Sequence, residues 1–450
     1  MFSLQDILRA TSGKLLTAGL GAAIKGVSID SRTLKPQDLF IAIKGDRFDG
    51  HDFIEEALKK KAAAVISAKD ILPKNTSAAV IKVNDTLVAL GQIAGEHRRK
   101  FHIPVIAVTG SNGKTTTKDM IACVLGARFS VLKNIGTKNN AVGLPMTLLG
   151  LRPGYDVCVL EIGTNHFGEV KYLADIASAN IGLITNIGPA HLEFLKSLDG
   201  VFKEKSDLLR ALVNPAIGII NADDVFLKGG QKLFRDRFII SFGIENRAEF
   251  AASDIKLRGN KIEFRVNKKQ KIVLDTCGFQ NVYNALCAIA TARLFGMDYR
   301  TIALRLAAFS FPEGRLKFVR KNRINFIDDT YNSNPLSLSC ALDSLEALKI
   351  KGRKILVMGD MLELGEEAEK LHRESADRIS RICDCFIGVG ELASATARAI
   401  REKRRGDDGV FVCATATQAR DMLLNKIRPL AEDLVLVKGS RRLTMEEVLR

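Results

Sequence analysis

The chain has no tryptophan, and aromatic residues make up only 6% of its 450 residues. Proteins that hold nucleic acid by stacking bases depend on aromatic side chains, so this shortage argues against that class of partner. The formal net charge of +16 points the other way, but the basic residues are spread along the whole chain. A small polyanionic substrate, with phosphates and carboxylates, would also suit a basic protein. Composition alone does not decide between these partners.

Long apolar runs are missing as well, since none approaches the about 18 residues that a membrane helix needs. The stretch from Met1 to Arg9 contains an acid and no signal-like apolar core. We therefore expect a first helix there, no membrane partner and a cytoplasmic location. The eight cysteines are scattered and fit core positions in a reducing compartment. Cys383 and Cys385 have no second pair nearby, so we predict a strand there instead of a metal site.

The length of 450 residues suggests about three domains. Apolar residues at 46% and charged residues at 26% are typical of a soluble globular protein. Apolar strands alternate with helical patterns, which predicts an α/β fold with largely parallel sheets. We predict a small N-terminal α/β domain at residues 1–99, a central domain with a mostly parallel sheet at 100–311, and a doubly wound, Rossmann-like domain at 312–450.

The most informative stretch is VIAVTGSNGKTTTK, at residues 105–118. Its apolar start predicts a buried strand, and helical spacing of the apolar residues after it predicts a helix. Gly110 and Gly113 allow the backbone to curl until several N–H groups face one anion. Lys114 can reach terminal phosphates, and the Thr115 hydroxyl can bind a magnesium ion. The stretch therefore predicts a phosphate loop.

The full phosphate-loop pattern GxxxxGK[ST] is not met, because Val108 occupies the place of its first glycine and only GxxGKT remains. An ordinary turn rich in Gly and Ser, between a strand and a helix, is the alternative. We favour nucleotide binding, since Gly-Lys-Thr-Thr stands at the predicted helix start.

Polar residues follow several apolar strands of the central segment. Glu161 ends one strand, where phosphate-loop enzymes hold their metal, and Mg²⁺ takes few oxygen ligands from protein. We predict Thr115 and Glu161 as magnesium ligands, against the alternative of a solvated strand end. His191 also follows a strand, but a lone histidine is often structural, and the residue pattern leaves both roles open.

Three residues on predicted helices have weaker signals. Lys205 lies in a helical pattern where its residue type alone predicts a surface position. Asn281 and Asn284 are one turn apart at a helix start, so both amides could face the edge of a base. Helix capping is the alternative for these two asparagines.

The two outer segments offer polar turns rather than complete motifs. Ser28 and the turn from Asp30 to Arg32 present hydroxyls, a guanidinium and backbone N–H groups, which suit a phosphorylated ligand. Surface loops of a small α/β domain are the stronger interpretation when these residues are considered alone. In the C-terminal segment, acids and amides at 328–335 and the cations Lys438 and Arg441 suit a ligand with ammonium and carboxylate groups. Ordinary turn and capping chemistry is the alternative.

Together these motifs resemble the Mur ligase family of ATP-dependent enzymes of peptidoglycan precursor synthesis. The resemblance covers all three segments and rests on TGSNGKTT at 109–116, EIG at 161–163, NIGPAH at 186–191, NVYNAL at 281–286 and GR at 314–315. Stretches at 328–335, 359–365 and 437–441 are most similar to members that add D-alanyl-D-alanine to UDP-N-acetylmuramoyl tripeptide. The N-terminal motifs are shared with the ligase that adds the third residue.

The resemblance implies a UDP-binding first domain, an ATP-binding second domain, and a third domain with the dipeptide site. It implies a monomer without a nucleic-acid partner, and a reaction through an acyl phosphate. It also implies ATP, two magnesium ions and a carbamylated lysine at Lys205. Asp207 stands where the family usually has Glu, and Gln280 where it usually has His.

The resemblance further assigns roles to individual residues. The implied catalytic residues are Lys114, His191 and Lys205. The implied metal ligands are Thr115, Glu161, His191 and Lys205. The implied ATP contacts are Thr109, Gly110, Ser111, Asn112, Gly113, Lys114, Thr115, Thr116, Asn281, Asn284, Arg315 and Asp329. The implied contacts with the other substrates are Ser28, Ser31, Arg32, Arg47, Asp49, His51, Thr137, Asn139, Asn140, Asn165, His166, Tyr331, Asn332, Asn334, Lys438, Ser440 and Arg441.

Three other functions stay open from the sequence. The same fold could serve another acceptor, as in the diamino-acid-adding ligase or a folylpolyglutamate synthase. A phosphate-loop protein could bind nucleic acid through its positive charge and act as a helicase or regulator. A nucleotide-binding scaffold without catalysis is the third alternative.

Overall fold

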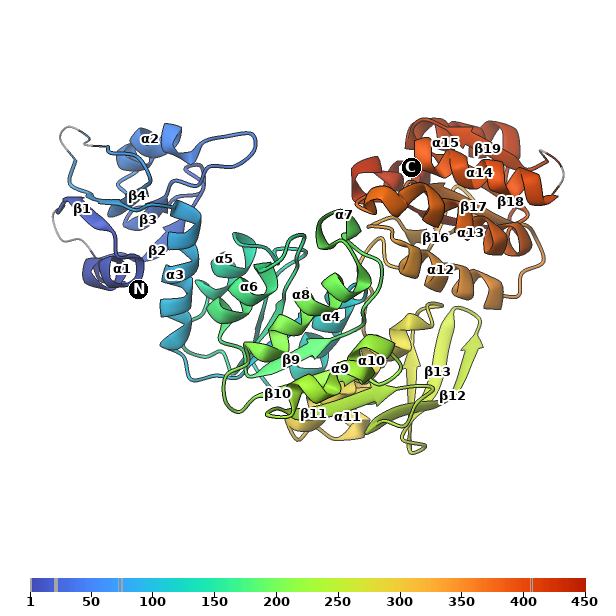
Figure 1. The fold of residues 1–450 in the computed structure, drawn as a ribbon, viewed down its shortest axis with the longest axis horizontal. Helices are drawn as coiled ribbons and strands as arrows, with labels where there is room; N and C mark the ends of the chain where they lie inside the picture. The colour runs from blue at the N-terminus through green and yellow to red at the C-terminus, as the bar shows by residue number, and fades with distance from the viewer. Residues whose placement is uncertain (1, 20–22, 72, 74–75, 405, 407) are drawn as a thin grey trace.

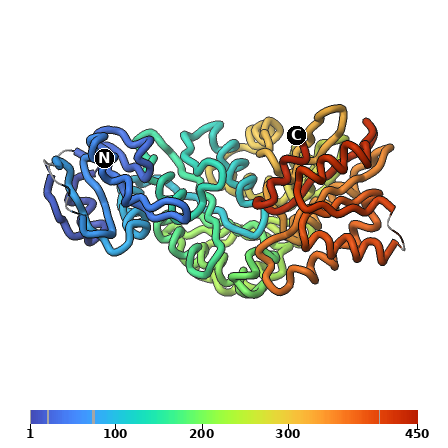
Figure 2. Tube along the Cα trace, turned by 90° about the horizontal axis from the view of Figure 1, so that it is seen from above, coloured from blue at the N-terminus to red at the C-terminus, as the bar shows by residue number. Residues whose placement is uncertain are grey.

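A computed structural model describes residues 2–19, 23–71, 73, 76–404, 406 and 408–450. They form three sheets that follow one another along the chain, so the predicted α/β class with three domains is confirmed. The two outer domains rise on either side of the central one, and the molecule is open between them (Figure 1). Figure 2, turned by 90°, shows the three domains in a row. Within the described residues, no helix is both long enough and apolar enough to cross a membrane.

The N-terminal domain is built on a five-stranded sheet in the order β1-β5-β4-β3-β2, parallel except for β1. Its strands are β1 (Lys14–Thr17), β2 (Gly26–Ser28), β3 (Asp38–Ile41), β4 (Ala64–Ser67) and β5 (Ala79–Lys82). Its helices are α1 (Leu4–Thr11), η1 (Gly50–Phe53) and α2 (Ile54–Lys59). The first helix is present as predicted, although Met1 lies outside the described residues.

The central domain has a nine-stranded sheet in the order β14-β13-β12-β11-β10-β9-β6-β8-β7. Its strands are β6 (Val105–Thr109), β7 (Val131–Lys133), β8 (Val157–Glu161), β9 (Ile181–Ile184), β10 (Ile217–Asn221), β11 (Phe238–Gly243), β12 (Phe250–Arg258), β13 (Lys261–Val266) and β14 (Gln270–Leu274). Its helices are α3 (Thr86–Arg99), α4 (Lys114–Leu125), α5 (Gly143–Leu148), α6 (Glu169–Ala177), α7 (Leu192–Leu195), α8 (Leu198–Arg210), α9 (Val225–Gly230), η2 (Gln231–Phe234), α10 (Gln280–Leu294) and α11 (Tyr299–Ala307).

Strand β6 shows why the middle of this sheet is continuously apolar. Val105 and Ala107 pack into one core cluster, whereas Ile106 and Val108 pack into a second cluster on the opposite face. Helices cover both faces, so each residue of the strand is buried and parallel pairing is favoured.

The far edge of the central sheet departs from the predicted parallel arrangement. Strands β12, β13 and β14 pair antiparallel with one another. Burial alternates along β12 and β13, so one face packs on the core and the other meets solvent. That alternation allows hairpin connections in place of helical crossovers.

The C-terminal domain has a six-stranded sheet in the order β15-β16-β20-β17-β18-β19, parallel except for β15. Its strands are β15 (Lys317–Lys321), β16 (Ile324–Asp329), β17 (Lys354–Gly359), β18 (Cys385–Val389), β19 (Val410–Cys413) and β20 (Leu434–Lys438). Its helical segments are α12 (Pro335–Ala347), η3 (Gly365–Glu367), α13 (Ala368–Ile382), α14 (Glu391–Arg404), α15 (Ala416–Met422), η4 (Leu423–Ile427), η5 (Arg441–Leu443) and η6 (Met445–Leu449). Separate core clusters line the two faces of the sheet, as a doubly wound fold requires.

Helix α3 joins the first two domains, because it packs on α1 of the first and on α5 and α6 of the second. Arg98, near its C-terminus, is buried and donates to the carbonyls of Ala177 (3.1 Å), Phe101 (2.5 Å) and Ile103 (3.1 Å). The guanidinium therefore ties the end of the helix to the central domain. The predicted boundaries between the domains, at residues 99 and 311, stay predictions.

We expect Arg98→Met to lower the free energy of unfolding by about 3 kcal/mol, because it leaves buried carbonyl oxygens without donors. Denaturant unfolding followed by circular dichroism measures this loss. Arg99→Met is the matched control, since that neighbouring side chain is 58% exposed. A loss no larger than that of the control would contradict the structural role of Arg98.

Candidate active site

The predicted phosphate loop, residues 109–116, joins β6 to α4. Gly110 and Gly113 have φ of +146° and +83°, which disfavour other residues. A Cβ on Gly110 would lie 1.9 Å from Thr185 Oγ1, and one on Gly113 would lie 2.3 Å from Asn284 Oδ1. The first turn of α4 leaves backbone N–H groups without intrahelical acceptors. The N–H groups of Ser111 and Asn112 donate to Asn186, so the donors that an anion needs come from the start of α4.

A cavity of about 1120 Å³ lies between the central and C-terminal domains. The predicted site residues that line it are Ser111, Asn112, Gly113, Lys114, Thr115, Thr116, Thr137, Asn139, Asn140, Glu161, Asn165, His191, Asn281, Asn284, Arg315, Asp329, Tyr331, Asn332, Asn334 and Lys438. All predicted site residues belong to the described part of the chain, and those that do not line this cavity are Ser28, Ser31, Arg32, Arg47, Asp49, His51, Thr109, Gly110, His166, Lys205, Ser440 and Arg441.

The amine of Lys114 folds back over its own loop. Its Nζ donates to Gly110 O at 2.8 Å and to Ser111 O at 3.3 Å. Burial lowers the pKa of Lys114, the carboxylate of Glu161 opposes this shift, and Arg315 adds to it. A phosphate in the loop would supply the counter-charge that this amine lacks.

Lys205 is buried, with 1% of the residue exposed, so the surface position suggested by its residue type is wrong. It lies on α8, where Val201, Leu208 and Leu209 are buried on the same side. In the described part of the chain, its amine has no hydrogen bond or ion pair. Burial, with a smaller contribution from the charge of Lys114, holds the pKa of Lys205 well below its ordinary value, while Glu204 opposes the shift.

Glu161 is likewise buried, at 1% exposure, at the end of β8. Its Oε1 accepts from Asn139 Nδ2 at 2.7 Å. Its Oε2 is buried and accepts no hydrogen bond from any described residue. A buried carboxylate oxygen without a donor fits a bound cation, so these residues suit Mg²⁺. Within the described ranges, no group of three or more His, Cys, Asp or Glu side chains is placed so that it could hold a metal ion.

Asn281 and Asn284 share one side of α10, as predicted, but their amides are already engaged. Asn284 Nδ2 donates to Asn281 Oδ1 at 2.9 Å, and Asn281 Nδ2 donates to Thr276 Oγ1 at 3.1 Å. Asn284 Oδ1 accepts from Thr117 at 3.1 Å. The pair therefore offers fewer free groups to a base edge than its spacing alone suggests.

The prediction assigned no role to Asp223, Glu204 or Lys118. Asp223 lines the cavity and accepts from the Tyr283 hydroxyl at 3.0 Å. Burial raises the pKa of Asp223, but backbone N–H groups such as that of Ile244 lower it overall. The available signal was its place two residues after the end of β10, among the polar residues that follow this strand.

Glu204 is fully buried and accepts from Thr164 Oγ1 at 3.0 Å and from the N–H groups of Gly168 and Val170 at 2.7 and 2.8 Å. Its carboxylate thereby holds the start of α6 against α8. No motif marks this residue, and only its place beside Lys205 could have drawn attention to it.

The C-terminal wall of the cavity holds a buried ion pair. Lys438 Nζ lies 2.6 Å from Asp329 Oδ2 and donates to Asn332 O at 3.0 Å. Lys438 ends β20 and Asp329 ends β16, and these strands are parallel neighbours. The predicted residues of this wall are therefore brought together by the sheet, as ligand sites of such sheets usually are.

Two contacts join this wall to the phosphate loop. The side-chain amides of Asn112 and Asn334 hydrogen-bond reciprocally, at 3.1 and 2.9 Å. Arg315 Nη2 donates to Thr115 Oγ1 at 3.3 Å, and its guanidinium stacks 4.0 Å from the Tyr331 ring centroid. The groups predicted to bind nucleotide and metal thus also carry the contact between the domains.

His191 makes a third contact between the same two domains. Its Nδ1 lies 2.7 Å from Glu363 Oε2. A carboxylate can only accept, so Nδ1 carries the hydrogen and Nε2 is left for a ligand. His191 has φ of +55°, an uncommon conformation outside glycine. The hydrogen bond from His191 is the largest cause that lowers the pKa of Glu363 below its ordinary value. Burial of Glu363 opposes this shift, and the charge of His191 adds a smaller lowering.

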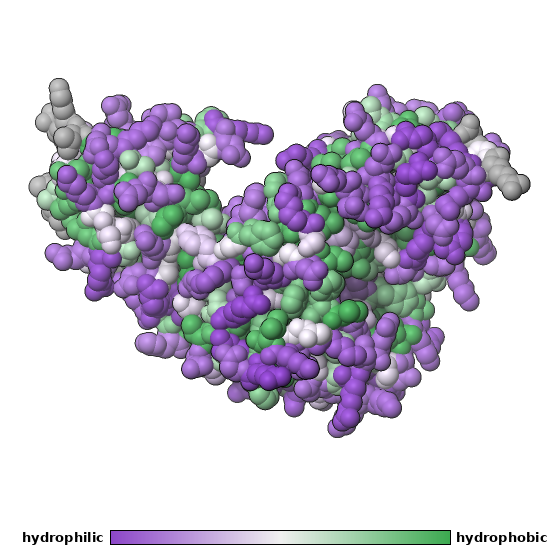
Figure 3. Space-filling view, viewed as in Figure 1, coloured by the Kyte–Doolittle hydropathy of each residue, from purple (hydrophilic) through white to green (hydrophobic). Residues whose placement is uncertain are grey.

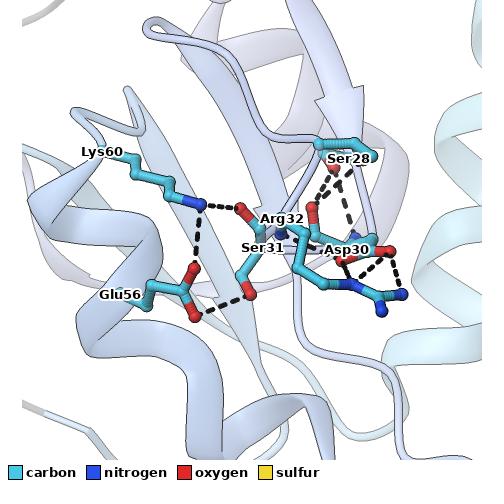
Figure 4. A network of polar contacts seen from close by, with 7 residues as sticks. Ser28, Asp30, Ser31, Arg32, Glu56 and Lys60 are labelled. Atoms are coloured by element: carbon cyan, nitrogen blue, oxygen red, sulfur yellow. Dashed lines mark hydrogen bonds and ion pairs between the residues drawn. The ribbon is translucent and has the colours of Figure 1, made fainter.

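The predicted N-terminal site forms a separate network (Figure 4). The Arg32 guanidinium pairs with Asp30 at 2.7 Å and lowers the pKa of Asp30 to about 2. Ser31 Oγ donates to Glu56 Oε2 at 2.9 Å, and Lys60 Nζ donates to Ser31 O at 2.8 Å. These residues lie in the first domain, away from the central cavity. Figure 3 shows the hollow that separates this domain from the C-terminal one.

His51 has both ring nitrogens occupied in this structure. Its Nε2 accepts from the N–H of Ala68 at 3.0 Å, and its Nδ1 donates to Asp49 at 2.5 Å. Asp49 also pairs with Lys69 at 2.9 Å. The ring pins η1 to the end of β4 and has no free nitrogen for a substrate here.

We expect the contact between His191 and Glu363 to depend on pH. A carboxyl group whose folded-state pKa is lowered stabilises the fold above its unfolded pKa, and this stability is lost as pH falls through the folded value. Glu363→Gln should therefore speed hydrogen exchange of residues 191–196 several-fold at pH 7, and the difference from the unmodified protein should disappear as pH falls through the lowered folded-state pKa of Glu363. Glu367→Gln is the control, because Glu367 pairs with Lys370 in its own domain. Equal exchange at pH 7 would contradict the contact.

Comparison with known families gives three matches along the chain. The Mur ligase family catalytic-domain model matches residues 23–98, the Mur ligase middle-domain model matches 108–292, and the Mur ligase glutamate-ligase-domain model matches 314–441. Among curated relatives, the UDP-N-acetylmuramoyl-tripeptide--D-alanyl-D-alanine ligase of Bacillus subtilis is 33% identical over 95% of this chain and 93% of the relative. The enzyme of the same name from Escherichia coli is 34% identical over 99% and 96%.

Solved structures agree with these matches. A MurF crystal structure from Acinetobacter baumannii superposes with a TM-score of 0.90 at 31% identity, and covers 100% of this chain and 98% of that one. A MurF ligase from Thermotoga maritima in complex with ADP gives a TM-score of 0.84 at 27% identity, over 95% and 96%. Sequence similarity over nearly the whole chain and the shared three-domain fold lead to one conclusion: the chain belongs to the Mur ligase family.

Proposed function

We propose that this chain is an ATP-dependent ligase that joins D-alanyl-D-alanine to UDP-N-acetylmuramoyl tripeptide and forms the pentapeptide precursor of peptidoglycan. One observation carries the proposal: the phosphate loop, the buried Glu161 with an unpartnered oxygen, and the Lys438–Asp329 wall share a single cavity. Relatives that bear the name of this activity cover nearly the full chain.

The chemistry explains why these groups are needed together. A carboxylate is a poor acylating agent, because it is anionic and lacks a leaving group. Transfer of the γ-phosphoryl group of ATP to the tripeptide carboxylate gives an acyl phosphate and ADP. The dipeptide amine then attacks the carbonyl carbon, loses a proton, and expels inorganic phosphate. Lys114 and the N–H groups of the loop stabilise charge on the transferring group.

Thr115, Glu161 and His191 would hold magnesium, with a modified Lys205 beside them. When bound, Mg²⁺ would neutralise the repulsion between ATP and the substrate carboxylate. Carbamylation of Lys205 requires a neutral amine that attacks carbon dioxide and releases a proton. Its burial, its lowered pKa and its lack of a partner among the described residues favour the neutral form of the amine. The resulting carbamate would supply the anionic oxygens that a second magnesium ion needs.

The UDP end of the nucleotide sugar and the dipeptide would bind to the two outer domains. The N-terminal domain would bind the UDP end through the Ser28–Arg32 turn and through Arg47 and Asp49. The dipeptide would meet Tyr331, Asn332 and Lys438 on the C-terminal wall. Closure of these domains would exclude water from the acyl phosphate.

We also propose a cytoplasmic monomer that needs neither nucleic acid nor membrane. All eight cysteines are free, and seven of them carry raised thiol pKa values because they are buried. Such thiols fit a reducing compartment.

The first test is phosphate release from ATP and Mg²⁺ with UDP-N-acetylmuramoyl tripeptide, with and without D-alanyl-D-alanine. We expect release only with both substrates, and a pentapeptide product by mass. Release with a diamino acid and the dipeptide precursor would instead assign the preceding ligation step. Stimulation by polynucleotide, or silence with every acceptor, would contradict the ligase assignment.

A second prediction concerns Lys205. We expect Lys205→Ala to lower kcat by about 10²- to 10³-fold, because it removes an anionic metal ligand, and short carboxylates such as acetate should restore part of the rate. Lys203→Ala is the matched control, since Lys203 is exposed on the same helix. Full activity of Lys205→Ala without added carboxylate would exclude the carbamate.

A further inference from the structure

Lys118 is a second lysine on α4, one turn after Lys114. It is 1% exposed, and it does not line the cavity. Burying an ammonium group is costly unless it is paired. An apolar side chain of similar length would fill the same space at lower cost, so the retained charge calls for an explanation.

The ammonium of Lys118 holds the loop between β7 and α5. Its Nζ donates to Asn134 O at 2.8 Å and to Gly136 O at 3.2 Å. This loop, residues 134–140, carries Thr137, Asn139 and Asn140 into the cavity. Lys118 therefore supports, from behind, the segment that presents three of the predicted substrate contacts.

The same ammonium faces the carboxylate of Glu161. Nζ lies 3.9 Å from Glu161 Oε2, the oxygen that has no hydrogen-bond donor among the described residues. It also lies 3.5 Å from Asp119 Oδ1, on the next residue of α4, so the ammonium has a carboxylate partner on its own helix as well. Asn139 Nδ2 donates to the other oxygen, Oε1. Asn134 closes the arrangement, because its side chain accepts from the N–H of Glu161 and donates to its C=O. Loop and carboxylate are thus held as one unit.

We propose that Lys118 is a positioning residue that fixes the 134–140 loop and the Glu161 carboxylate relative to the phosphate loop. In this role it sets where Asn139 meets the UDP-N-acetylmuramoyl substrate and where Glu161 meets the cation, without touching either. The role rests on the proposed function for its substrate, but the fixing of the loop is a property of the protein alone. Because Lys114 and Lys118 are one turn apart on α4, this helix would fix the position of the 134–140 loop relative to the bound nucleotide.

Hydrogen exchange of the protein without ligands tests the fixing directly. In Lys118→Met we expect the amides of residues 137–144 to exchange at least tenfold faster, with the rest of the central domain within twofold. Lys171→Met is the control, because Lys171 is an exposed lysine of the same domain that pairs with Asp175 on its own helix, α6. Unchanged exchange in the loop, or the same acceleration in the control, would overturn the proposal.

Steady-state kinetics test the consequence for the reaction. Lys118→Met should raise the KM for UDP-N-acetylmuramoyl tripeptide and the activation constant for Mg²⁺ at least tenfold. The KM for D-alanyl-D-alanine should stay within twofold, since that site lies on the other wall. An equal rise in both KM values would mean a general loss of structure and would overturn the proposal.

Coupling to Asn139 gives a sharper criterion. If Lys118 acts through the loop, Lys118→Met and Asn139→Ala should not be additive in the Mg²⁺ activation constant. Additive effects of the two substitutions would contradict the action of Lys118 through the loop. Should Lys118→Met fail to fold, Lys118→Gln, which keeps a donor but no charge, undergoes the same tests with the same criteria. Inactivity of the unmodified protein would contradict the proposed function, whereas the exchange result decides the role of Lys118 independently.

Discussion

The structure depends on charge buried at the carboxyl edge of the central sheet. Glu161 and Lys118 lie there with 1% exposure, Lys114 is half-buried, and one oxygen of Glu161 lacks a donor among the described residues. Charges in such surroundings are costly unless a counter-charge is supplied. The phosphates and the cation of the proposed reaction would supply counter-charges at this edge. The surrounding helices shield these charges from water, which would otherwise solvate them.

The local motifs were predictable because they depend on short-range chemistry. Glycines at 110 and 113, with Lys114 at the helix start, define the phosphate loop whatever the rest of the chain does. The position of Glu161 at the end of a buried strand was predictable, whereas its role as a metal ligand stays a prediction. The residue type of Lys205 led to a wrong prediction of exposure, although the surrounding pattern carries a signal for burial. Lys205 stands four residues from Val201 and from Leu209, and therefore on the apolar face of α8.

Other features needed the folded chain. The antiparallel strands β12 to β14 carry alternating burial, a weaker pattern than the continuous apolar runs beside them. The ties between Asn112 and Asn334 join residues that are 222 positions apart, so no local pattern could pair them. In the sequence, Lys118 has no feature that distinguishes it from other helical lysines. Its hydrogen bonds to the loop after β7 exist only in the folded chain. The roles assigned to the N-terminal turn stay predictions, since its polar groups here are occupied by one another.

The hydrogen bond from Arg315 to the Thr115 hydroxyl links the position of the C-terminal domain to the predicted cation site at the phosphate loop. One hydroxyl serves both as a predicted metal ligand and as one of the two points where the C-terminal wall contacts the phosphate loop. Two events that draw on one group cannot be independent, and such coupling is reciprocal. Whatever cation binding does to the position of the C-terminal domain, the position of that domain does, by the same factor, to cation affinity. A cation bound at Thr115 and the position of the C-terminal domain would in this way be coupled.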